Sequence, residues 1–281
     1  MTSQSITPEL QRWIIEQAEG GHGAEAILQA MRASGWQEDV AIAALEETLL
    51  AHVQSQPVQR VAPEDLALPR VDTEGNTLWA HDREIHIVSS LNHPRVVVLA
   101  NVLSDDECAA LIELAKPRLA RSETVQDATG SSEVNEARTS QGMFFGRQEG
   151  ELIERIEQRL SALMNWPIER GEGLQVLRYA PGAEYRPHYD YFDPDRPGTA
   201  AVLKRGGQRV GTLVMYLNTP DKGGATTFPD VGLSVHAKKG HAVFFSYALP
   251  VPSTRTLHGG APVLEGEKWV ATKWLRQGRF D

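Results

Sequence analysis

The chain has 281 residues, 41% of them hydrophobic and 23% charged, which is enough apolar material for one large domain and a small one. Its formal net charge of −9 argues against a general nucleic-acid binder, because neutralising phosphates requires an excess of lysine and arginine. A run of about 18 apolar residues is absent and the N-terminus lacks the pattern of a secretory signal, so we expect a cytoplasmic protein that makes no use of a membrane.

Residues 1–52 are predicted to form a small module of three helices. Apolar residues recur at helical spacing in three short stretches, which are separated by a glycine-rich turn at 20–23 and by Gly35. The following stretch, 53–78, is polar, contains prolines and has no such period, so it is predicted to be a linker. The module either recruits a protein partner or packs against the domain that follows.

Residues 79–281 are predicted to form the main domain. A buried strand and turn are expected at 94–103, a helix capped by its first residue, a serine, at 104–119, and a second amphipathic helix at 149–164. The polar segment between the two helices, 120–142, is expected to be a loop.

Short strand-like runs follow the second helix, separated by glycine and proline turns. They lie at 174–179, 212–217, 233–237, 241–247 and 268–275. Several short strands at such intervals predict a sandwich or barrel, here with helices packed on one side, so the expected fold class is α+β.

One candidate metal site stands out. His188 and Asp190 are two residues apart in EYRPHYDYF, so on an extended strand their side chains share a face, and His258 in TRTLHGG is the best candidate for a third ligand. Two imidazoles and one carboxylate form the triad associated with non-haem Fe(II), which leaves positions open for a co-substrate and dioxygen. The single cysteine, Cys108, cannot form a thiolate metal site. A hydrogen-bonded loop histidine is the alternative for a lone His-x-Asp pair.

Lys268 adds a second feature, ten residues after His258 in HGGAPVLEGEKWVATKW. Its strand neighbours are apolar, which places it to enter the barrel, and a buried lysine requires an anionic partner. A carboxylate of 2-oxoglutarate would be such a partner. The alternative is an exposed strand lysine, which is the role that we expect for Lys273.

The stretch 94–276 resembles the catalytic domain of prolyl 4-hydroxylases, in particular the collagen-type, algal and bacterial members. The likeness runs in order through EGLQVLRYAPGAEYRPHYDYF, GGQRVGTLVMYLN, GGATTFPDVG and LHGGAPVLEGEKWVATKW. The resemblance implies a double-stranded β-helix, or jelly roll, with Fe(II) held by His188, Asp190 and His258 and 2-oxoglutarate held by Lys268.

The resemblance also implies roles for further residues. Tyr179 would donate its hydroxyl to the co-substrate, with Thr226 as a lesser candidate nearby. The substrate contacts of the family correspond here to Arg138, Ser140, Glu172, Tyr185, Arg209 and Trp274. The rings of Tyr185 and Trp274 suit a proline ring, although core packing would also explain them. Glu172 and Arg209 could instead form a structural ion pair.

Three positions depart from the family pattern. Arg276 stands where many relatives have a histidine, Ala225 where a glutamate is common, and Ala261 where a cysteine is common. None of them belongs to the predicted triad, so the oxygenase interpretation holds, while Arg276 affects the expected mode of peptide binding.

The sequence therefore predicts an Fe(II)- and 2-oxoglutarate-dependent dioxygenase that consumes O2, with ascorbate as the expected reductant. Its expected reaction is hydroxylation of peptidyl proline to 4-hydroxyproline, with release of succinate and CO2, and its expected partner is a protein or peptide that contains proline. The alternatives are a hydroxylase of a free amino acid or another small molecule, and a non-catalytic metal-binding or sensor barrel.

Overall fold

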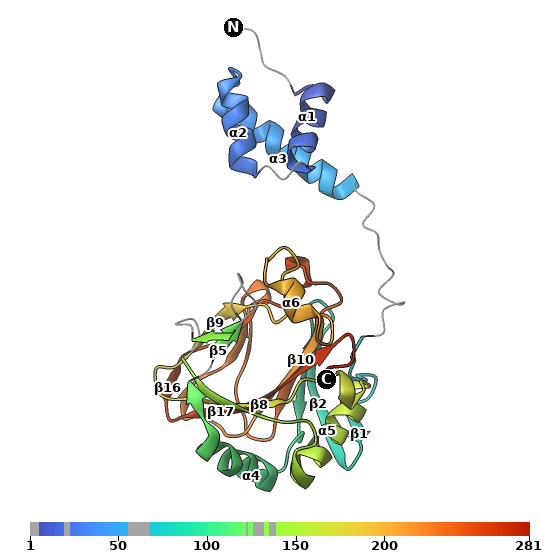
Figure 1. The fold of residues 1–281 in the computed structure, drawn as a ribbon, viewed down its shortest axis with the longest axis vertical. Helices are drawn as coiled ribbons and strands as arrows, with labels where there is room; N and C mark the ends of the chain where they lie inside the picture. Colours follow the sequence, from blue (N-terminus) through green and yellow to red (C-terminus); the bar gives the residue numbers. More distant parts are fainter. Residues whose placement is uncertain (1–5, 20–22, 56–67, 122, 126–131, 135–138) are drawn as a thin grey trace. The chain divides into compact units, whose positions relative to one another are not determined.

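In the computed structural model the chain divides into two compact units, Met1–Asp65 and Leu66–Asp281 (Figure 1). The structure describes the whole chain except residues 1–5, 20–22, 56–67, 122, 126–131 and 135–138. None of the described helices is long and apolar enough to cross a membrane.

The first unit consists of three helices around a small apolar core. The helices are α1 (Pro8–Glu19), α2 (Ala24–Ala33) and α3 (Glu38–Ser55). Their core is formed by Ile14, Ile27, Met31, Ala41, Ala44 and Leu45. The helix α3 continues three residues into the range expected as linker, and the first strand of the second unit begins at Thr77, inside the same range. Residues 56–67 of that range lie outside the described residues.

The second unit is built on two antiparallel sheets. The larger sheet has nine strands in the order β1-β2-β3-β14-β10-β17-β8-β7-β4. In that order they span Thr77–Ala80, Arg83–Leu91, Arg95–Ala100, Ala242–Ser246, Arg209–Tyr216, Lys268–Arg276, Leu174–Tyr179, Gln141–Phe145 and Ala120–Arg121. The smaller sheet has the order β13-β12-β15-β9, with strands Leu233–Val235, Thr226–Phe228, His258–Gly260 and Tyr185–His188.

Two pairs of short strands complete the β-structure. They are β11 (Lys222–Gly223) with β16 (Val263–Glu265), and β5 (Glu123–Val125) with β6 (Ser132–Val134). Apolar side chains from the facing surfaces of the two main sheets form one core cluster, in which Phe228 of the smaller sheet meets Phe245 of the larger one. This is the predicted jelly roll, and the α+β fold class is confirmed.

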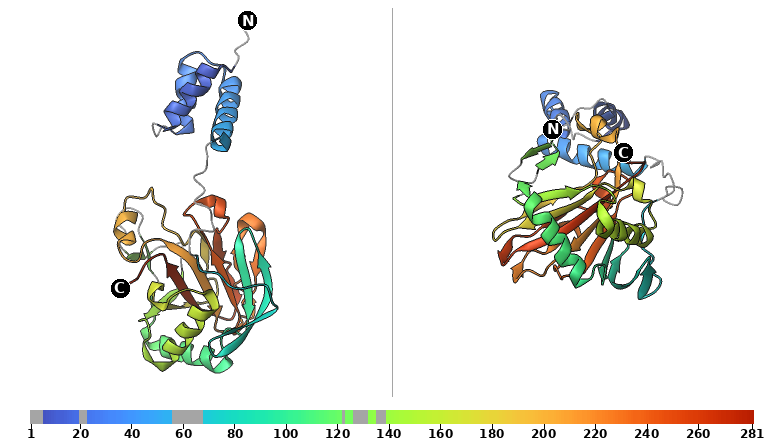
Figure 2. Two further views of the ribbon diagram at one scale, coloured as in Figure 1. Left: turned by 90° about the vertical axis from the view of Figure 1, so that its right-hand side faces the viewer. Right: turned by 60° about the horizontal axis from the view of Figure 1, so that its bottom comes forward.

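Helices cover the outer face of the larger sheet (Figure 2). They are α4 (Asp105–Ala115) and α5 (Gly150–Met164), while the short α6 (Thr199–Leu203) lies in the connection from β9 to β10. Single turns of 3-10 helix occur at Lys116–Arg118, Ile168–Arg170, Pro229–Val231 and Pro252–Thr254. Ser104 caps α4 as predicted, because its hydroxyl accepts from the backbone of Glu107 while that carboxylate accepts from the backbone of Ser104.

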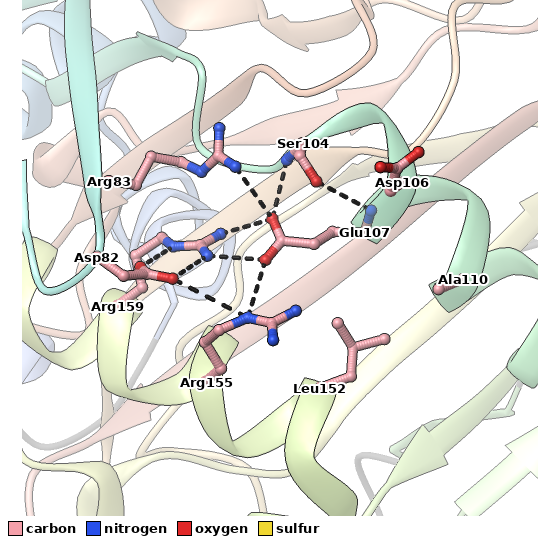
Figure 3. A pocket seen from close by; sticks show the side chains of 9 residues that line it. All are labelled: Asp82, Arg83, Ser104, Asp106, Glu107, Ala110, Leu152, Arg155 and Arg159. Atoms are coloured by element: carbon pink, nitrogen blue, oxygen red, sulfur yellow. Dashed lines mark hydrogen bonds and ion pairs between the residues drawn. The ribbon is translucent and has the colours of Figure 1, made fainter.

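A buried charged cluster joins both helices to the turn between β1 and β2 (Figure 3). Arg159 of α5 is 1% exposed and donates to both carboxylate oxygens of Asp82 at 2.7 Å. It also donates to Glu107 of α4 at 2.7 and 2.8 Å and to the carbonyl of Val102 at 2.9 Å. One planar guanidinium therefore connects three elements through charge-assisted hydrogen bonds.

The alternation of side chains along β17 separates its two lysines. Residues 268, 270, 272 and 274 face the cavity between the sheets, whereas residues 269, 271 and 275 pack beneath the helices. Lys268 therefore enters the barrel. Lys273 points to the helix side, where it is 3% exposed and ion-paired with Glu157 of α5, so its predicted role as an exposed lysine is wrong. Both faces of this strand are covered, so the strand has no solvent-exposed face on which Lys273 could lie.

The segment expected as a loop at 120–142 contains short strands instead. β4 pairs with β7 at the edge of the larger sheet, and β5 pairs with β6 as a separate two-stranded ribbon. Pairing satisfies backbone N–H and C=O groups that a loop would leave to solvent, which is why a polar sequence can still form strands here.

Candidate active site

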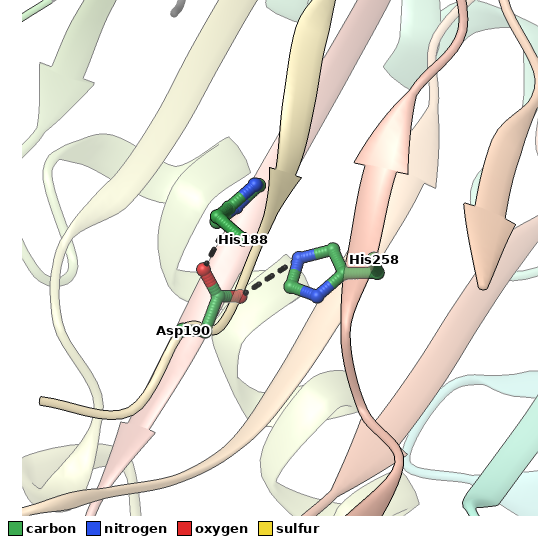
Figure 4. A group of neighbouring side chains, drawn as sticks. All are labelled: His188, Asp190 and His258. Atoms are coloured by element: carbon green, nitrogen blue, oxygen red, sulfur yellow. Dashed lines mark ion pairs between the residues drawn. The ribbon is translucent and has the colours of Figure 1, made fainter. Parts of the chain in front are cut away.

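Two paired strands of the smaller sheet bring three potential metal ligands together (Figure 4). His188 ends β9 and is directly opposite His258 on β15, and Asp190 follows two residues after the end of β9. The Nε2 atoms of His188 and His258 each lie 3.4 Å from a carboxylate oxygen of Asp190. One ligand atom from each residue lies within 4.8 Å of the others, and this is the one such cluster in the described part of the chain.

Backbone carbonyls fix the orientation of both imidazole rings. The Nδ1 of His188 lies 2.9 Å from the carbonyl oxygen of Arg186, and the Nδ1 of His258 lies 2.9 Å from that of Thr256. Because a carbonyl only accepts, each Nδ1 carries the proton and each Nε2 keeps a lone pair for a metal. The ring of Tyr185 also stacks on His188 with centroids 3.7 Å apart.

The protonation states suit metal binding. Burial lowers the pKa of His188, and the neighbouring His258 lowers it further, which favours the neutral ring. Burial raises the pKa of Asp190, but the two adjacent histidine rings outweigh it and hold that pKa well below its ordinary value. A neutral imidazole and an ionised carboxylate are the forms that bind a divalent cation. Two imidazoles and a carboxylate on one side of the centre fit non-haem Fe(II).

Lys268 lies in the same cavity as the triad. Its side chain is 4% exposed, and its Nζ lies 5.6 Å from the ring centre of Tyr179 and 5.8 Å from that of Tyr216. Within the part of the chain that the structure describes, no carboxylate pairs with this ammonium group. Burial lowers the pKa of Lys268 to about 8. The donor set thus fits a small dianionic acid, because one carboxylate would compensate this buried cation.

The two residues suggested as further co-substrate contacts also lie at this cavity. Tyr179 is paired with Lys268 across the β8–β17 ladder, and its ring packs near the ammonium group. Thr226 on β12 is buried, and its hydroxyl accepts a hydrogen bond of 2.9 Å from the hydroxyl of Tyr216. Tyr216, which sequence reasoning did not single out, is therefore part of the wall around Lys268.

Two of the predicted substrate residues pair with each other. Arg209 donates from Nε and Nη2 to the two carboxylate oxygens of Glu172, at 2.7 and 2.9 Å. The guanidinium also lies 4.2 Å from the ring centre of Trp274 and 3.4 Å from the carbonyl oxygen of Asp190. The structural ion pair considered from the sequence is therefore present, and it supports the backbone of a triad residue.

The other predicted substrate residues have different surroundings. Tyr185 and Trp274 both line the cavity that holds the triad. Ser140 is fully buried next to β7. Arg138 lies outside the described residues. Their contacts with a substrate stay predictions.

Arg276, the main departure from the family pattern, is a buried anchor. Its side chain is 1% exposed and lies 3.5 Å from Glu172. Its guanidinium donates to the carbonyls of Val202 and Arg205, and it thereby ties the end of α6 to β17.

Sequence reasoning missed two polar residues behind the triad. The hydroxyl of Thr212 donates to Asp190 Oδ2 at 2.7 Å and lies 3.1 Å from the hydroxyl of Tyr247. Thr212 stands in the apolar run RVGTLVMY, and a hydroxyl in a strand that is buried on both faces is the signal that could have drawn attention to it.

The chain is similar to several known proteins. The family model for the 2OG-Fe(II) oxygenase superfamily matches residues 174–276. Prolyl 4-hydroxylase 5 of Arabidopsis thaliana is 41% identical over 230 residues, which is 74% of this chain and 75% of that relative. Prolyl 4-hydroxylase 1 of the same plant is 41% identical over 224 residues, covering 71% of this chain and 77% of the relative. A viral collagen prolyl hydroxylase from Paramecium Bursaria Chlorella virus-1, solved with 2OG, is 32% identical, covers 64% of this chain and 95% of its own, and has a TM-score of 0.49.

Proposed function

Because this chain belongs to the prolyl 4-hydroxylase family of 2-oxoglutarate- and Fe(II)-dependent oxygenases, we propose that it hydroxylates a prolyl residue of a peptide or protein to 4-hydroxyproline. The enzyme is a dioxygenase that uses Fe(II), 2-oxoglutarate and O2. The observation that carries the proposal is the meeting of His188, Asp190 and His258 with the buried Lys268 in one cavity.

The residues of the cavity divide the work of binding. His188 and His258 would hold the iron through Nε2 and Asp190 through its carboxylate, while Lys268 would hold the carboxylate of the co-substrate that lies away from the metal. Bound together, Fe(II), 2-oxoglutarate and O2 supply the oxidation that converts a C–H bond to C–OH, with succinate and CO2 as the other products. The fixed imidazole rings and the apolar walls orient the groups and keep water out.

Two aromatic side chains support a prolyl substrate. Tyr185 and Trp274 line the cavity, and each presents a flat ring of the kind that packs well against a pyrrolidine. Arg209 lies 4.2 Å from the ring centre of Trp274 and pairs with Glu172 behind it, so this ring has little freedom to turn away. A preset aromatic wall lowers the entropic cost of binding a rigid ring.

The proposal is tested by measuring succinate release from 2-oxoglutarate, with Fe(II) and ascorbate, in the presence and absence of proline-rich peptides. We expect peptide-stimulated release and a mass increase of one oxygen on a prolyl residue. His188→Ala and His258→Ala should abolish both signals, and Lys268→Ala should chiefly raise the apparent KM for 2-oxoglutarate. Release that no peptide stimulates would redirect the search to free amino acids and other small molecules, and unchanged turnover in either histidine variant would refute the metal assignment.

A further inference from the structure

Thr212 lies at the centre of β10, where its side chain faces the interior of the barrel. Its strand neighbours across the larger sheet are Phe245 on β14 and Trp274 on β17, and its relative exposure is 0%. A hydroxyl in such surroundings is costly unless it is hydrogen-bonded, and valine would fill the same volume without that cost. The hydroxyl is satisfied by Asp190 Oδ2 at 2.7 Å.

The direction of this hydrogen bond also determines the direction of the next one. A metal-binding carboxylate is ionised and can only accept, so the one hydroxyl proton of Thr212 points to Asp190. The oxygen of Thr212 then accepts from the hydroxyl of Tyr247, which lies 3.1 Å away. The result is a relay that runs from Tyr247 through Thr212 to the carboxylate.

The three predicted ligands are not held in the same way. His188 and His258 are on paired strands, and backbone carbonyls orient their rings. Asp190 lies in a bend beyond the end of β9, so strand pairing does not fix its side chain. Arg209 reaches only its backbone carbonyl, at 3.4 Å. Among the described residues, the hydrogen bond to its carboxylate from outside the triad comes from Thr212.

Tyr247 is itself held firmly. It is 3% exposed, its ring meets Tyr191 edge-on with centroids 5.9 Å apart, and its backbone N–H donates to Val210 at 3.1 Å. Replacing it with phenylalanine would keep this packing and remove only the hydroxyl.

We propose that Thr212 and Tyr247 are positioning residues that fix the orientation of the Asp190 carboxylate for metal binding. This inference rests on the metal site of the proposed function. Groups that orient a metal ligand from behind contribute roughly 10- to 100-fold to metal affinity in other proteins.

The test is an anaerobic titration of the full chain with Mn(II), in which the EPR signal of the free ion measures how much Mn(II) is bound. Thr212→Val should bind Mn(II) roughly 10- to 100-fold more weakly than the native protein, while Thr212→Ser, which keeps the hydroxyl, should bind nearly as well. Tyr247→Phe should show a smaller loss of Mn(II) affinity. The double variant Tyr247→Phe/Thr212→Val should bind Mn(II) no more weakly than Thr212→Val alone, because without the Thr212 hydroxyl Tyr247 no longer acts on Asp190. Once each protein is saturated with Mn(II), the affinity for 2-oxoglutarate should be unchanged.

Tyr191→Phe is the matched control, since Tyr191 belongs to the same aromatic cluster and its hydroxyl is not part of the relay. It should bind Mn(II) like the native protein. Equal affinity in Thr212→Val and the native protein would overturn the relay, and an equal loss in Thr212→Ser would show a packing role instead. Failure of the native protein itself to bind Mn(II), or Mn(II) binding that survives His188→Ala, would overturn the metal site and the proposed function with it.

Discussion

Lys268 and Lys273 are on the same strand and are both buried, yet they face opposite environments. Lys273 is ion-paired with Glu157 and also donates to the backbone carbonyl of Glu172. Lys268 has aromatic rings around it and no carboxylate partner among the described residues. Burying a charge without compensation is costly, so such a group persists where a ligand supplies the opposite charge. At the scale of single residues, Lys268 marks the position of an anion more clearly than any motif does.

The lowered pKa of Lys268 predicts how the binding of 2-oxoglutarate depends on pH. Burial lowers this pKa to about 8, so the ammonium form is already present below that pH and binding reaches full strength there. Above about pH 8 the amine must take up a proton when the anion binds, so the dissociation constant should rise by up to tenfold per pH unit. Calorimetric titration of the Mn(II)-loaded protein between about pH 7 and 9.5 measures this slope.

Lys268→Arg provides the control for this prediction. A guanidinium stays charged over the whole range, so the affinity of this variant, whatever its absolute value, should lose the pH dependence that Lys268 causes. A native protein whose affinity is as independent of pH as that of the arginine variant would contradict the assignment of Lys268 as the anchor.

The helices on the larger sheet are attached by a charge cluster as well as by apolar contacts. Arg159 connects α5 with Glu107 of α4 and with Asp82 in the turn after β1. Burial raises the pKa of Glu107, but hydrogen bonds from Arg159 and from the backbone of Ser104, together with the charges of Arg159 and Arg83, outweigh it and hold the pKa at about 2. Removing one member of a buried pair leaves the other without compensation, so the cluster is sensitive to single substitutions.

We expect Glu107→Gln to lower the free energy of unfolding by about 3 kcal/mol at neutral pH. In the native protein the contribution of Glu107 is complete above its unfolded pKa of 4.5 and is lost as the pH falls toward 2, so the difference between native and variant should shrink over that window. Urea denaturation at several pH values measures this difference in the free energy of unfolding.

Glu113→Gln on the same helix is the control, because Glu113 is 69% exposed and its pair with Lys116 contributes about 1 kcal/mol or less. Equal effects of the two substitutions on the free energy of unfolding would refute the stabilising role of the charge cluster.

The sequence predicted those elements whose pattern is local. The cap at Ser104, the apolar face of α5 and the bounds of β8 follow from residues close together in the chain, and the structure has them where they were expected. The hairpin of β1 and β2 was not predicted, because its apolar residues do not mark one buried face: Ile85 is buried, whereas Trp79 and Val88 are exposed. The burial of Lys273 could not be predicted either, since it depends on Glu157, which is more than a hundred residues away in sequence.

The same distinction applies to the site. His188 and Asp190 are visible as a spaced pair, and Lys268 follows His258 on the next long strand, so all four residues can be read from order and spacing. Thr212 is on β10 and Tyr247 directly follows β14, and only the register of these paired strands brings both residues behind Asp190. That register cannot be inferred from the local sequence.

The two units of the molecule have separate cores and different charges. The core of the first uses residues between Ile6 and Leu49, and the two cores of the second use residues from Leu68 onward. Residues 1–65 contain ten acidic and three basic side chains, so this unit carries −7 of the chain's formal charge of −9. A unit of such charge would favour a basic partner if it recruits one.

Separate cores predict that the second unit works alone. Because the described residues of the two units share no core cluster, deleting residues 1–65 should leave its thermal unfolding temperature and its turnover of 2-oxoglutarate with a short peptide unchanged. Differential scanning calorimetry and succinate release measure the two quantities. A fall in either would mean that the catalytic unit depends on the helices for its stability or its site. A deletion that weakens only the binding of an intact protein substrate would indicate that the acidic unit recruits that substrate. High salt should then cause the same loss in the full chain, because a Debye length of about 10 Å at 0.1 M salt screens such an attraction.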